Sequence, residues 1–109
     1  MSCIFCKIIN KEADARVEYE DEDTLVIHDK HPAASTHLLV MPKEHYEKLM
    51  DTPPEIMPKL FEAVQRVAKK LGIDEDGFRV IINNGRGGGQ VIPHIHIHLL
   101  AGGRLPGFH

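Results

Sequence analysis

The stretch VIPHIHIHLLAGG, residues 91–103, places histidines at positions 94, 96 and 98, each separated from the next by an isoleucine. In a β-strand, residues two apart lie on the same face, about 6.6–7 Å from one another. The stretch therefore predicts a strand over residues 93–100 in which His94, His96 and His98 share one face. The apolar residues between them share the other face, which we expect to pack under a helix.

The apolar residues elsewhere in the chain predict a small α+β domain. A stripe at helical spacing indicates one long helix that begins near the capping-box sequence Thr52-Pro53-Pro54-Glu55 and ends at Gly72. Pro58 requires this helix either to kink or to begin later. The remaining pattern predicts a short helix over residues 3–12 and strands over residues 16–20, 24–28, 36–41, 78–82 and 93–100. This order predicts a single domain, residues 1–109, with a five-stranded, mainly antiparallel sheet.

Composition and charge argue against several classes of function. The 109 residues carry a net charge of −3, no tryptophan, four phenylalanines and two tyrosines. We therefore do not expect the protein to bind a nucleic-acid polymer, either through a positively charged surface or by stacking bases on aromatic side chains. No apolar run is long enough to span a bilayer, so we expect no membrane partner. The first residues show no charged leader followed by a long apolar stretch, and we expect a cytoplasmic protein.

The residues alone leave three explanations of the histidine row. The row is an exposed polar face, a metal site, or a site where one neutral imidazole attacks phosphorus and a second acts as acid and base. The preceding loop NNGRGGGQ, residues 83–90, contains four glycines, which let the backbone approach a ligand closely and form an anion-binding nest. Such a loop directly before three histidines favours a phosphate site where phosphorus is transferred.

Several segments together resemble the histidine triad (HIT) family. HIHIHLL, residues 94–100, has the form His-apolar-His-apolar-His-apolar-apolar that is the signature of the family. The other segments, in family order, are IFCKIINKE (4–12), LVIHD (25–29), THLLVMPKEH (36–45), INNGRGGGQ (82–90) and AGGR (101–104). The chain looks most similar to the branch of histidine triad nucleotide-binding proteins. The resemblance implies a compact fold with a short N-terminal helix and one longer helix, and a homodimer with one continuous sheet across both subunits.

The resemblance also implies a role for individual residues. His96 matches the nucleophile, which takes a nucleoside monophosphate onto its Nε2, and His98 matches the residue that contacts the phosphate and assists the leaving group. Asp29 matches the acid that holds the ribose hydroxyls. The other implied nucleotide-binding residues are Phe5, Ile8, Ile27 and Leu39 in the apolar slot for the base, His28 at its border, and Asn83, Gly89, Gln90 and the backbone of Val91 around the phosphate.

The function implied is hydrolysis of purine nucleoside 5′-phosphoramidates, or related nucleoside monophosphate esters, through a covalent nucleotidyl-histidine intermediate, with no metal in the chemical step. Two alternatives remain, a dinucleoside polyphosphate hydrolase and a non-catalytic nucleotide-binding module. Val91 departs from the family pattern, because relatives often carry a serine or threonine there. That hydroxyl would contact the phosphate or help to protonate the leaving group, so its absence bears on leaving-group preference.

Cys3 and Cys6 form a C-x-x-C pair, which in a reducing compartment indicates a metal or redox site rather than a structural disulfide. In some bacterial relatives this pair joins a histidine of the P-K-x-H segment and the first triad histidine around zinc. The resemblance therefore implies a structural zinc site made by Cys3, Cys6, His45 and His94. The remaining histidines, interpreted as structural or solvent-facing, are His28, His31, His37 and His109.

Overall fold

The computed structural model describes residues 3–107, so the predicted position of His109 lies outside the described residues. Its helices are α1 (Ile4–Ile9) and α2 (Met57–Leu71), and its strands are β1 (Val17–Glu20), β2 (Thr24–His28), β3 (Thr36–Pro42), β4 (Arg79–Ile82) and β5 (Ile97–Ala101). Short 3₁₀ turns occur at Leu49–Asp51, Pro54–Ile56 and Arg86–Gly88. The order of elements is the one that the sequence predicts.

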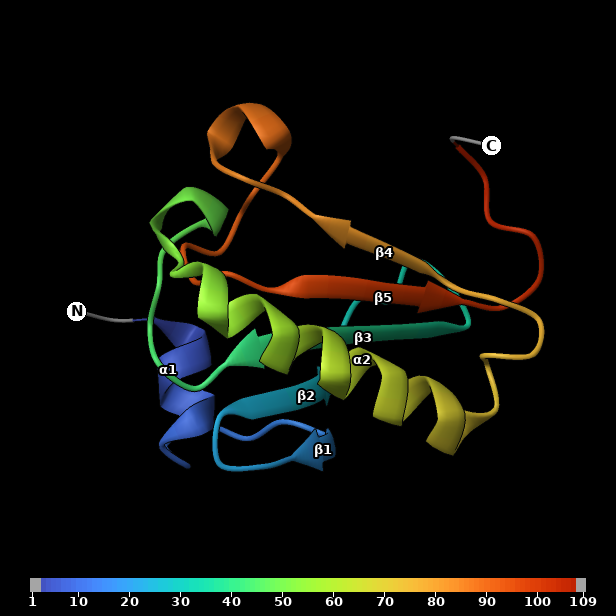
Figure 1. The fold of residues 1–109 in the computed structure, drawn as a ribbon, viewed down its shortest axis with the longest axis horizontal. Coiled ribbons are helices and arrows are strands. Elements are labelled where there is room, and N and C mark those ends of the chain that lie inside the picture. Colours follow the sequence, from blue (N-terminus) through green and yellow to red (C-terminus); the bar gives the residue numbers. More distant parts are fainter. Residues whose placement is uncertain (1–2, 108–109) are drawn as a thin grey trace.

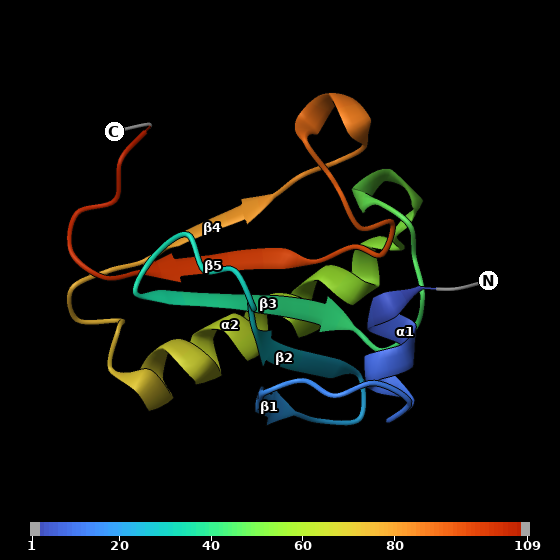
Figure 2. The same ribbon diagram turned by 180° about the vertical axis from the view of Figure 1, so that it is seen from behind.

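The strands form one antiparallel sheet in the order β1-β2-β3-β5-β4. The long helix α2 lies across one face of this sheet, and the short helix α1 covers only one end of the opposite face (Figures 1 and 2). The prediction of an α+β fold with a five-stranded sheet and two unequal helices is confirmed. The rest of that face has no helix over it among the described residues.

The core between α2 and the sheet follows from the apolar stripe of the helix. Ile97 and Leu99 are fully buried on this side, which confirms the prediction that the apolar face of the last strand packs under a helix. Gly72 ends α2 with φ 72°, a left-handed conformation that glycine adopts without steric cost. The other buried residues of this core are Val26, Leu38, Val40, Leu60, Ala63, Val64 and Val67.

The start of α2 differs from the prediction. The Thr52 hydroxyl donates to the Lys48 carbonyl at 2.9 Å and therefore does not cap the helix. A 3₁₀ turn over Pro54–Ile56 leads into α2 instead, and the α-helix begins at Met57. Pro58 falls in the first turn, where a missing N–H costs nothing, so the helix begins late and needs no kink.

The last strand is shorter than the alternating sequence predicts. β5 begins at Ile97, and the residues before it bend away from the ladder because His94 N–H bonds the Ile92 carbonyl at 2.9 Å. Ile95 N–H reaches the Tyr46 carbonyl, 2.7 Å away, which lies outside the sheet. His94 and His96 therefore precede the strand, and only His98 lies within it. Within residues 3–107, no helix is long and apolar enough to cross a membrane.

Candidate active site

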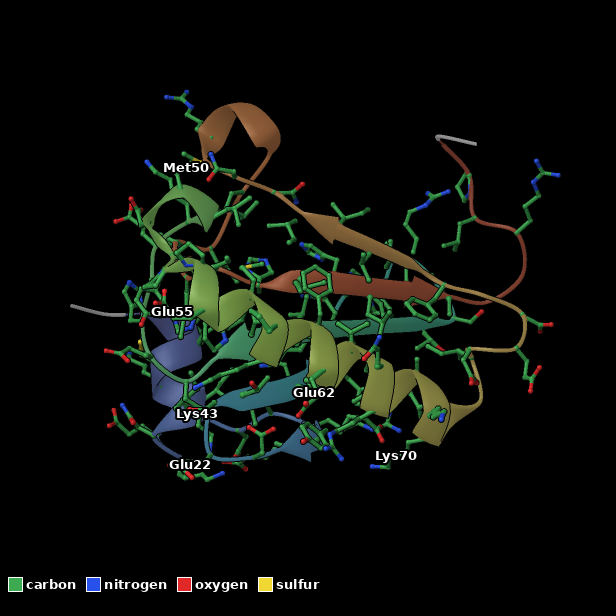
Figure 3. The ribbon with its side chains drawn as sticks, viewed as in Figure 1. Glu22, Lys43, Met50, Glu55, Glu62 and Lys70 are labelled. Carbon is green, nitrogen blue, oxygen red and sulfur yellow. The ribbon has the colours of Figure 1, made fainter. Side chains whose placement is uncertain are left out.

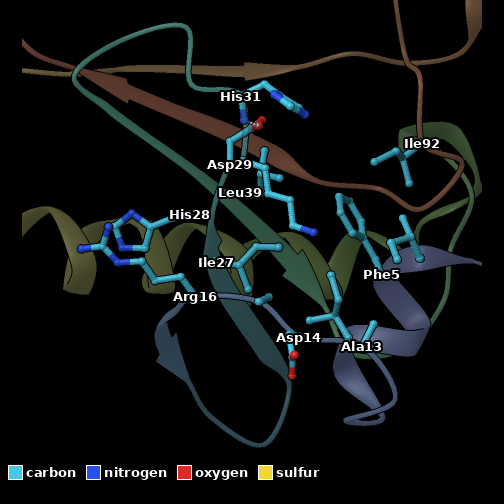
Figure 4. A pocket seen from close by; sticks show the side chains of 14 residues that line it. Phe5, Ala13, Asp14, Arg16, Ile27, His28, Asp29, His31, Leu39 and Ile92 are labelled. Atoms are coloured by element: carbon cyan, nitrogen blue, oxygen red, sulfur yellow. Dashed lines mark hydrogen bonds between the residues drawn. The ribbon is translucent and has the colours of Figure 1, made fainter.

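The side chains predicted to act together lie on the sheet face that α2 does not cover. A cavity of about 940 Å³ lies beside α1 and β2, and a smaller one of about 220 Å³ lies beside the glycine-rich loop. Both cavities are lined by Phe5, Asp29, Leu39 and Ile92, so the smaller cavity adjoins the larger one, whose lining is drawn in Figure 4. The larger cavity has room for a nucleoside, and the smaller one contains the histidines.

The larger cavity has an apolar floor and a charged rim. The four apolar residues predicted to contact the base lie together there, and all four are buried and line the cavity. These residues are Phe5, Ile8, Ile27 and Leu39. The exposed charged residues of the rim are Asp14, Arg16 and Lys30.

His28 borders this cavity, but its Nε2 is engaged elsewhere. Its Nε2 lies 2.8 Å from a carboxylate oxygen of Glu18, and the other oxygen of Glu18 pairs with Lys70 of α2 at 2.8 Å. Hydrogen bonds from Lys70 and then from His28 lower the pKa of the Glu18 carboxyl. His28 lies away from Phe5 in Figure 4, and Lys70 lies beside β1 in Figure 3. The prediction that His28 is structural agrees with these contacts.

His96 is held in one tautomer by the backbone. Its Nδ1 lies 2.8 Å from the His94 carbonyl, which can only accept, so Nδ1 carries the proton and Nε2 has a free lone pair. The side chain is 7% exposed, and Phe5 packs edge-on against it with ring centroids 5.1 Å apart. Burial lowers the pKa of His96. The ring is therefore a neutral, oriented imidazole with its nucleophilic nitrogen unblocked.

His98 lies beside His96, with ring centroids 4.9 Å apart, and is oriented by a chain of hydrogen bonds. Ala33 N–H donates to His37 Nδ1 at 2.9 Å, so the proton of His37 is on Nε2. That Nε2–H donates to His98 Nδ1 at 3.0 Å, which leaves the proton of His98 on Nε2. Burial, and then the neighbouring imidazoles of His96 and His37, lower the pKa of His98 to about 4.

Asp29 closes this group at the end of β2. One carboxylate oxygen accepts the His31 N–H at 2.8 Å, and the other lies 3.4 Å from His37 Nε2. Asp29, His37 and His98 converge closely enough to hold a metal ion. The hydrogen bond from Ala33 argues against one, because a neutral His37 whose Nδ1 accepts must keep its proton on the Nε2 that would bind the metal. Asp29, His37 and His98 are therefore linked by hydrogen bonds that fix which ring nitrogen carries each proton.

The glycine-rich loop is closed by the side chain of Gln90. The Gln90 carbonyl oxygen accepts the Gly85 N–H at 2.8 Å, and its amide donates to the carbonyls of Glu47 at 2.7 Å and Ile92 at 3.0 Å. The predicted phosphate residues Asn83, Gly89 and Val91 line the smaller cavity. Gln90 is therefore placed to shape the loop, and its side chain is not free to contact a phosphate.

The predicted metal ligands come together at the base of α1. The Sγ and Nδ1 atoms of Cys3, Cys6, His45 and His94 all lie within 4.8 Å of one another. The Nδ1 of His94 is 3.5 Å from Cys3 Sγ, 3.7 Å from Cys6 Sγ and 3.1 Å from His45 Nδ1. Ligand atoms around a tetrahedral zinc ion are about 3.3–3.8 Å apart, given the usual Zn–S and Zn–N bond lengths.

The protonation of this cluster also suits a metal. His94 Nε2 donates to the Pro42 carbonyl at 2.9 Å, so its Nδ1 lone pair faces the cluster. Cys3 Sγ accepts the Cys6 N–H at 3.4 Å, and both cysteines are free thiols. Burial, and then the neighbouring Cys3 sulfur, raise the pKa of the Cys6 thiol. These residues fit a zinc ion with two sulfur and two nitrogen ligands.

His37 was interpreted from the sequence as structural or solvent-facing, without a link to His98. It is 8% exposed and bonded to His98, so it is structural and not solvent-facing. A signal existed, because His37 shares a strand face with Leu39, and Leu39 pairs directly with His98 in the β3–β5 ladder. That pairing is not visible in the sequence without the strand order.

Comparison with known proteins identifies the family of this chain. A model of the HIT domain matches residues 10–105, and the chain belongs to the HIT (histidine triad) family. An uncharacterized HIT-like protein of Chlamydia muridarum is 47% identical over 96% of this chain and 85% of its own length. A 14 kDa zinc-binding protein of Zea mays is 43% identical over 94% of this chain and 83% of its own.

Solved structures share the fold closely. A histidine triad protein from Clostridium difficile superposes with a TM-score of 0.94 at 44% identity, over 100% of this chain and 97% of the other. A HIT family hydrolase from Legionella pneumophila gives 0.89 at 39% identity, over 95% of both chains. A zinc-bound histidine triad family protein from Mycobacterium smegmatis gives 0.85 at 41% identity, over 92% of this chain and 74% of the other.

Proposed function

We propose that this protein hydrolyses purine nucleoside 5′-phosphoramidates and related nucleoside monophosphate derivatives through a nucleotidyl-His96 intermediate. The observation that carries the proposal is the tautomer of His96, whose Nδ1–H is held by the His94 carbonyl while Nε2 stays free. A neutral imidazole presented in this way beside a cavity for a nucleoside is suited to attack phosphorus.

The reaction proceeds in two displacements. His96 Nε2 forms a bond to the α-phosphorus, the bond from phosphorus to the leaving atom breaks, and the leaving group departs with the electron pair. An amine leaving group takes up one proton from solvent as it departs. A water molecule then attacks phosphorus, the P–N bond breaks, and its electron pair returns to Nε2. The products are a nucleoside monophosphate and the former leaving group, and the water proton passes to solvent.

Other residues bind and orient the substrate in this scheme. The apolar floor of the larger cavity holds the base, and Asp29 accepts hydrogen bonds from the ribose hydroxyls with the carboxylate that His31 N–H already orients. Asn83, Gly89 and the N–H of Val91 face the phosphate from the glycine-rich loop. His98 donates its Nε2–H to the phosphate or leaving atom, and His37 is a positioning residue that sets this tautomer.

Cys3, Cys6, His45 and His94 would hold a zinc ion, which is supported by their converging Sγ and Nδ1 atoms. With two thiolates and two imidazoles as ligands, the ion would fill its coordination from the protein and act as a structural centre. His94 would then link α1 to the residues that carry His96. Free thiols at this centre agree with a reducing, cytoplasmic compartment.

We also propose a homodimer that pairs through β4. This strand lies at the edge of the sheet, and Val80 on it is 38% exposed. Phe61 of α2, 39% exposed, and Phe78, 38% exposed, add apolar surface. An edge strand with exposed apolar residues is suited to pairing with a second copy.

The decisive experiment follows the covalent intermediate. Wild-type protein mixed with an adenosine 5′-phosphoramidate should release AMP. When the reaction is stopped rapidly without acid, which would break the P–N bond, mass spectrometry of the intact protein should detect the nucleotidyl-His96 adduct. His96→Ala should lose both signals but still bind AMP, whereas Lys69→Ala, which removes an exposed side chain of α2 on the other face of the sheet, serves as the control and should keep both signals. AMP release at the wild-type rate by His96→Ala would refute the mechanism. Turnover of diadenosine polyphosphates alone would favour a dinucleoside polyphosphate hydrolase. Binding of AMP without turnover of any substrate would favour a non-catalytic nucleotide-binding module.

A further inference from the structure

We propose that Cys3 and Cys6 are a reversible oxidation site, at which a peroxide converts the two thiols into a disulfide, displaces the metal and weakens nucleotide binding beside α1. The assignment rests on the proposed function, because nucleotide binding is the property that it controls. Two sulfurs that fit a zinc ion thus have a second chemical state, with a different effect on the fold.

The two thiols are placed to form a disulfide without unfolding α1. Both are free, and their sulfurs belong to the cluster whose ligand atoms lie within 4.8 Å of one another. Cys3 is the N-cap of α1, and the Cys6 N–H donates to its sulfur at 3.4 Å. Residues three apart on a helix have Cα atoms about 5 Å apart, inside the range of about 4.4–6.8 Å found in disulfides. The backbone therefore needs no large movement for the sulfurs to bond.

The two thiols differ in their access to an oxidant. Cys3 is 6% exposed, whereas Cys6 is partly exposed and therefore meets dissolved reagents first. As zinc ligands both sulfurs would be thiolates, which is the form of cysteine that attacks peroxides. The sequence has no other cysteine. Cys6 is thus the site of attack, and Cys3 is the thiol that resolves the product.

The oxidation proceeds in two displacements. Cys6 Sγ attacks one oxygen of hydrogen peroxide, an S–O bond forms, the O–O bond breaks, and hydroxide departs, which leaves Cys6 as a sulfenic acid. Cys3 Sγ then attacks Cys6 Sγ, the S–S bond forms, the S–O bond breaks, and a second hydroxide departs. Each hydroxide takes a proton from solvent, so two thiolates lose two electrons in total and the peroxide is reduced to two waters. A thiol reductant reverses the change by exchange.

A disulfide removes the link between α1 and the rest of the cluster. In the reduced cluster, Cys6 Sγ lies 3.3 Å from His45 Nδ1, and Cys3 Sγ lies 3.5 Å from His94 Nδ1. The neutral sulfurs of a disulfide do not supply the thiolate charge that zinc prefers, and two imidazoles alone bind the ion much more weakly. A metal would join α1 to the segments that carry His45 and His94, whereas the disulfide joins two residues at the start of α1 only to each other.

Nucleotide binding depends on the position of α1. Two of the four apolar residues of the slot for the base, Phe5 and Ile8, are on α1, and Phe5 projects from it into the cavity (Figure 4). The other two, Ile27 and Leu39, are on the sheet. α1 has six residues, and a helix of that length is not stable in water without tertiary contacts. Without the link through the cysteines, α1 would be held mainly by the burial of Phe5 and Ile8.

The groups that act on phosphorus are oriented by hydrogen bonds that do not involve α1. The His96 Nδ1–H is bonded to the His94 carbonyl at 2.8 Å, and the His94 Nε2–H to the Pro42 carbonyl at 2.9 Å. His98 is bonded to His37 of β3. Oxidation should therefore raise the Kd for a nucleotide, and KM with it, more than it lowers kcat. If α1 is docked in about one tenth of the oxidised molecules, the apparent Kd rises about tenfold.

The test compares zinc-loaded, reduced protein before and after treatment with hydrogen peroxide. A thiol-labelling reagent should find both cysteines before treatment and neither afterwards, and a chromogenic chelator should detect the released zinc. By titration calorimetry, the oxidised protein should bind AMP about tenfold more weakly. Dithiothreitol with added zinc should restore the thiols, the metal and the affinity.

The matched control is the double variant Cys3→Ala/Cys6→Ala, which cannot form the disulfide. Peroxide should change its Kd for AMP by less than about twofold. Met50, which is 78% exposed, is open to oxidation in both proteins alike, so the comparison isolates the two thiols.

Three results would overturn the inference and leave the proposed function intact. They are thiols and zinc that persist in peroxide, thiols that reductant does not restore, and a disulfide that leaves the Kd for AMP unchanged. Reduced protein that does not bind AMP would instead refute the proposed function, and with it the control of nucleotide binding by oxidation.

Discussion

Replacing Cys6 by serine should remove the metal from the cluster at the base of α1. Cys6 Sγ lies 3.3 Å from His45 Nδ1 and 3.7 Å from His94 Nδ1, so it occupies one corner of the ligand set. A serine hydroxyl keeps its proton at neutral pH and does not supply the anionic sulfur that zinc prefers. The three remaining ligands would bind zinc much more weakly.

The size of the effect follows from linkage between binding and folding. A ligand that binds only the folded chain stabilises it by about 2.7 kcal/mol at 100 times its Kd and about 4.1 kcal/mol at 1,000 times. For a domain near 100 residues, each kcal/mol shifts Tm by about 4–8 °C. Cys6→Ser should therefore lower Tm by about 10–30 °C in the presence of zinc, and by much less when both proteins are compared in chelator.

The effect should depend on pH in a defined direction. Burial raises the pKa of the Cys6 thiol, and a thiol must lose its proton to bind zinc. Because protons compete with the metal, zinc affinity should fall as pH falls, by up to about 100-fold per pH unit when two thiol protons are released.

Elemental analysis of protein purified without chelator should find about one zinc per chain in the wild type and little in Cys6→Ser. Thermal melts with and without zinc give the change in Tm. His31→Ala is the control, because it removes an exposed imidazole outside the cluster. If wild-type protein contains no metal and added zinc does not change its Tm, the zinc site is refuted. His94 would then be available as an acid or base in catalysis.

Three further predictions concern stability, pH and assembly. In Gly102→Ala the new Cβ would lie 2.6 Å from Ser35 Cβ at φ 121°, whereas in Gly103→Ala it meets nothing within 4 Å at φ 64°. Urea unfolding should therefore show a loss of about 1–2 kcal/mol for Gly103→Ala and about 1–3 kcal/mol more for Gly102→Ala, and equal losses would contradict the contact. The pKa of His98 is lowered from 6.5 to about 4, so the unfolded chain binds the extra proton first, and stability should fall as pH drops from about 6.5 to about 4. After allowance for the solvent contact of the ring, the loss is about 2 kcal/mol, and His98→Asn should flatten that part of the stability profile measured by urea unfolding at each pH. Val80→Lys at the β4 edge should convert a dimer to a monomer in sedimentation, and a wild-type protein that sediments as a 12.3 kDa monomer would refute the dimer.

The sequence by itself determined the elements and their faces. The stripe in residues 57–71 is a pattern of local periodicity, and it predicts a helix because each residue contributes to one face irrespective of its distant partners. The same reasoning placed Ile97 and Leu99 in the core. The family resemblance also named Cys3 and Cys6 as parts of a cluster that the fold does assemble.

Only the tertiary structure decided what each histidine can do. The three histidines look equivalent in HIHIH, but their protons are set by acceptors and donors from different places: Pro42 for His94, the His94 carbonyl for His96, and His37 for His98. Two of these partners are 52 and 61 residues away in the chain. Periodicity reports which face a residue shares with its neighbours, whereas tautomer and pKa depend on burial and on groups that strand order brings into contact.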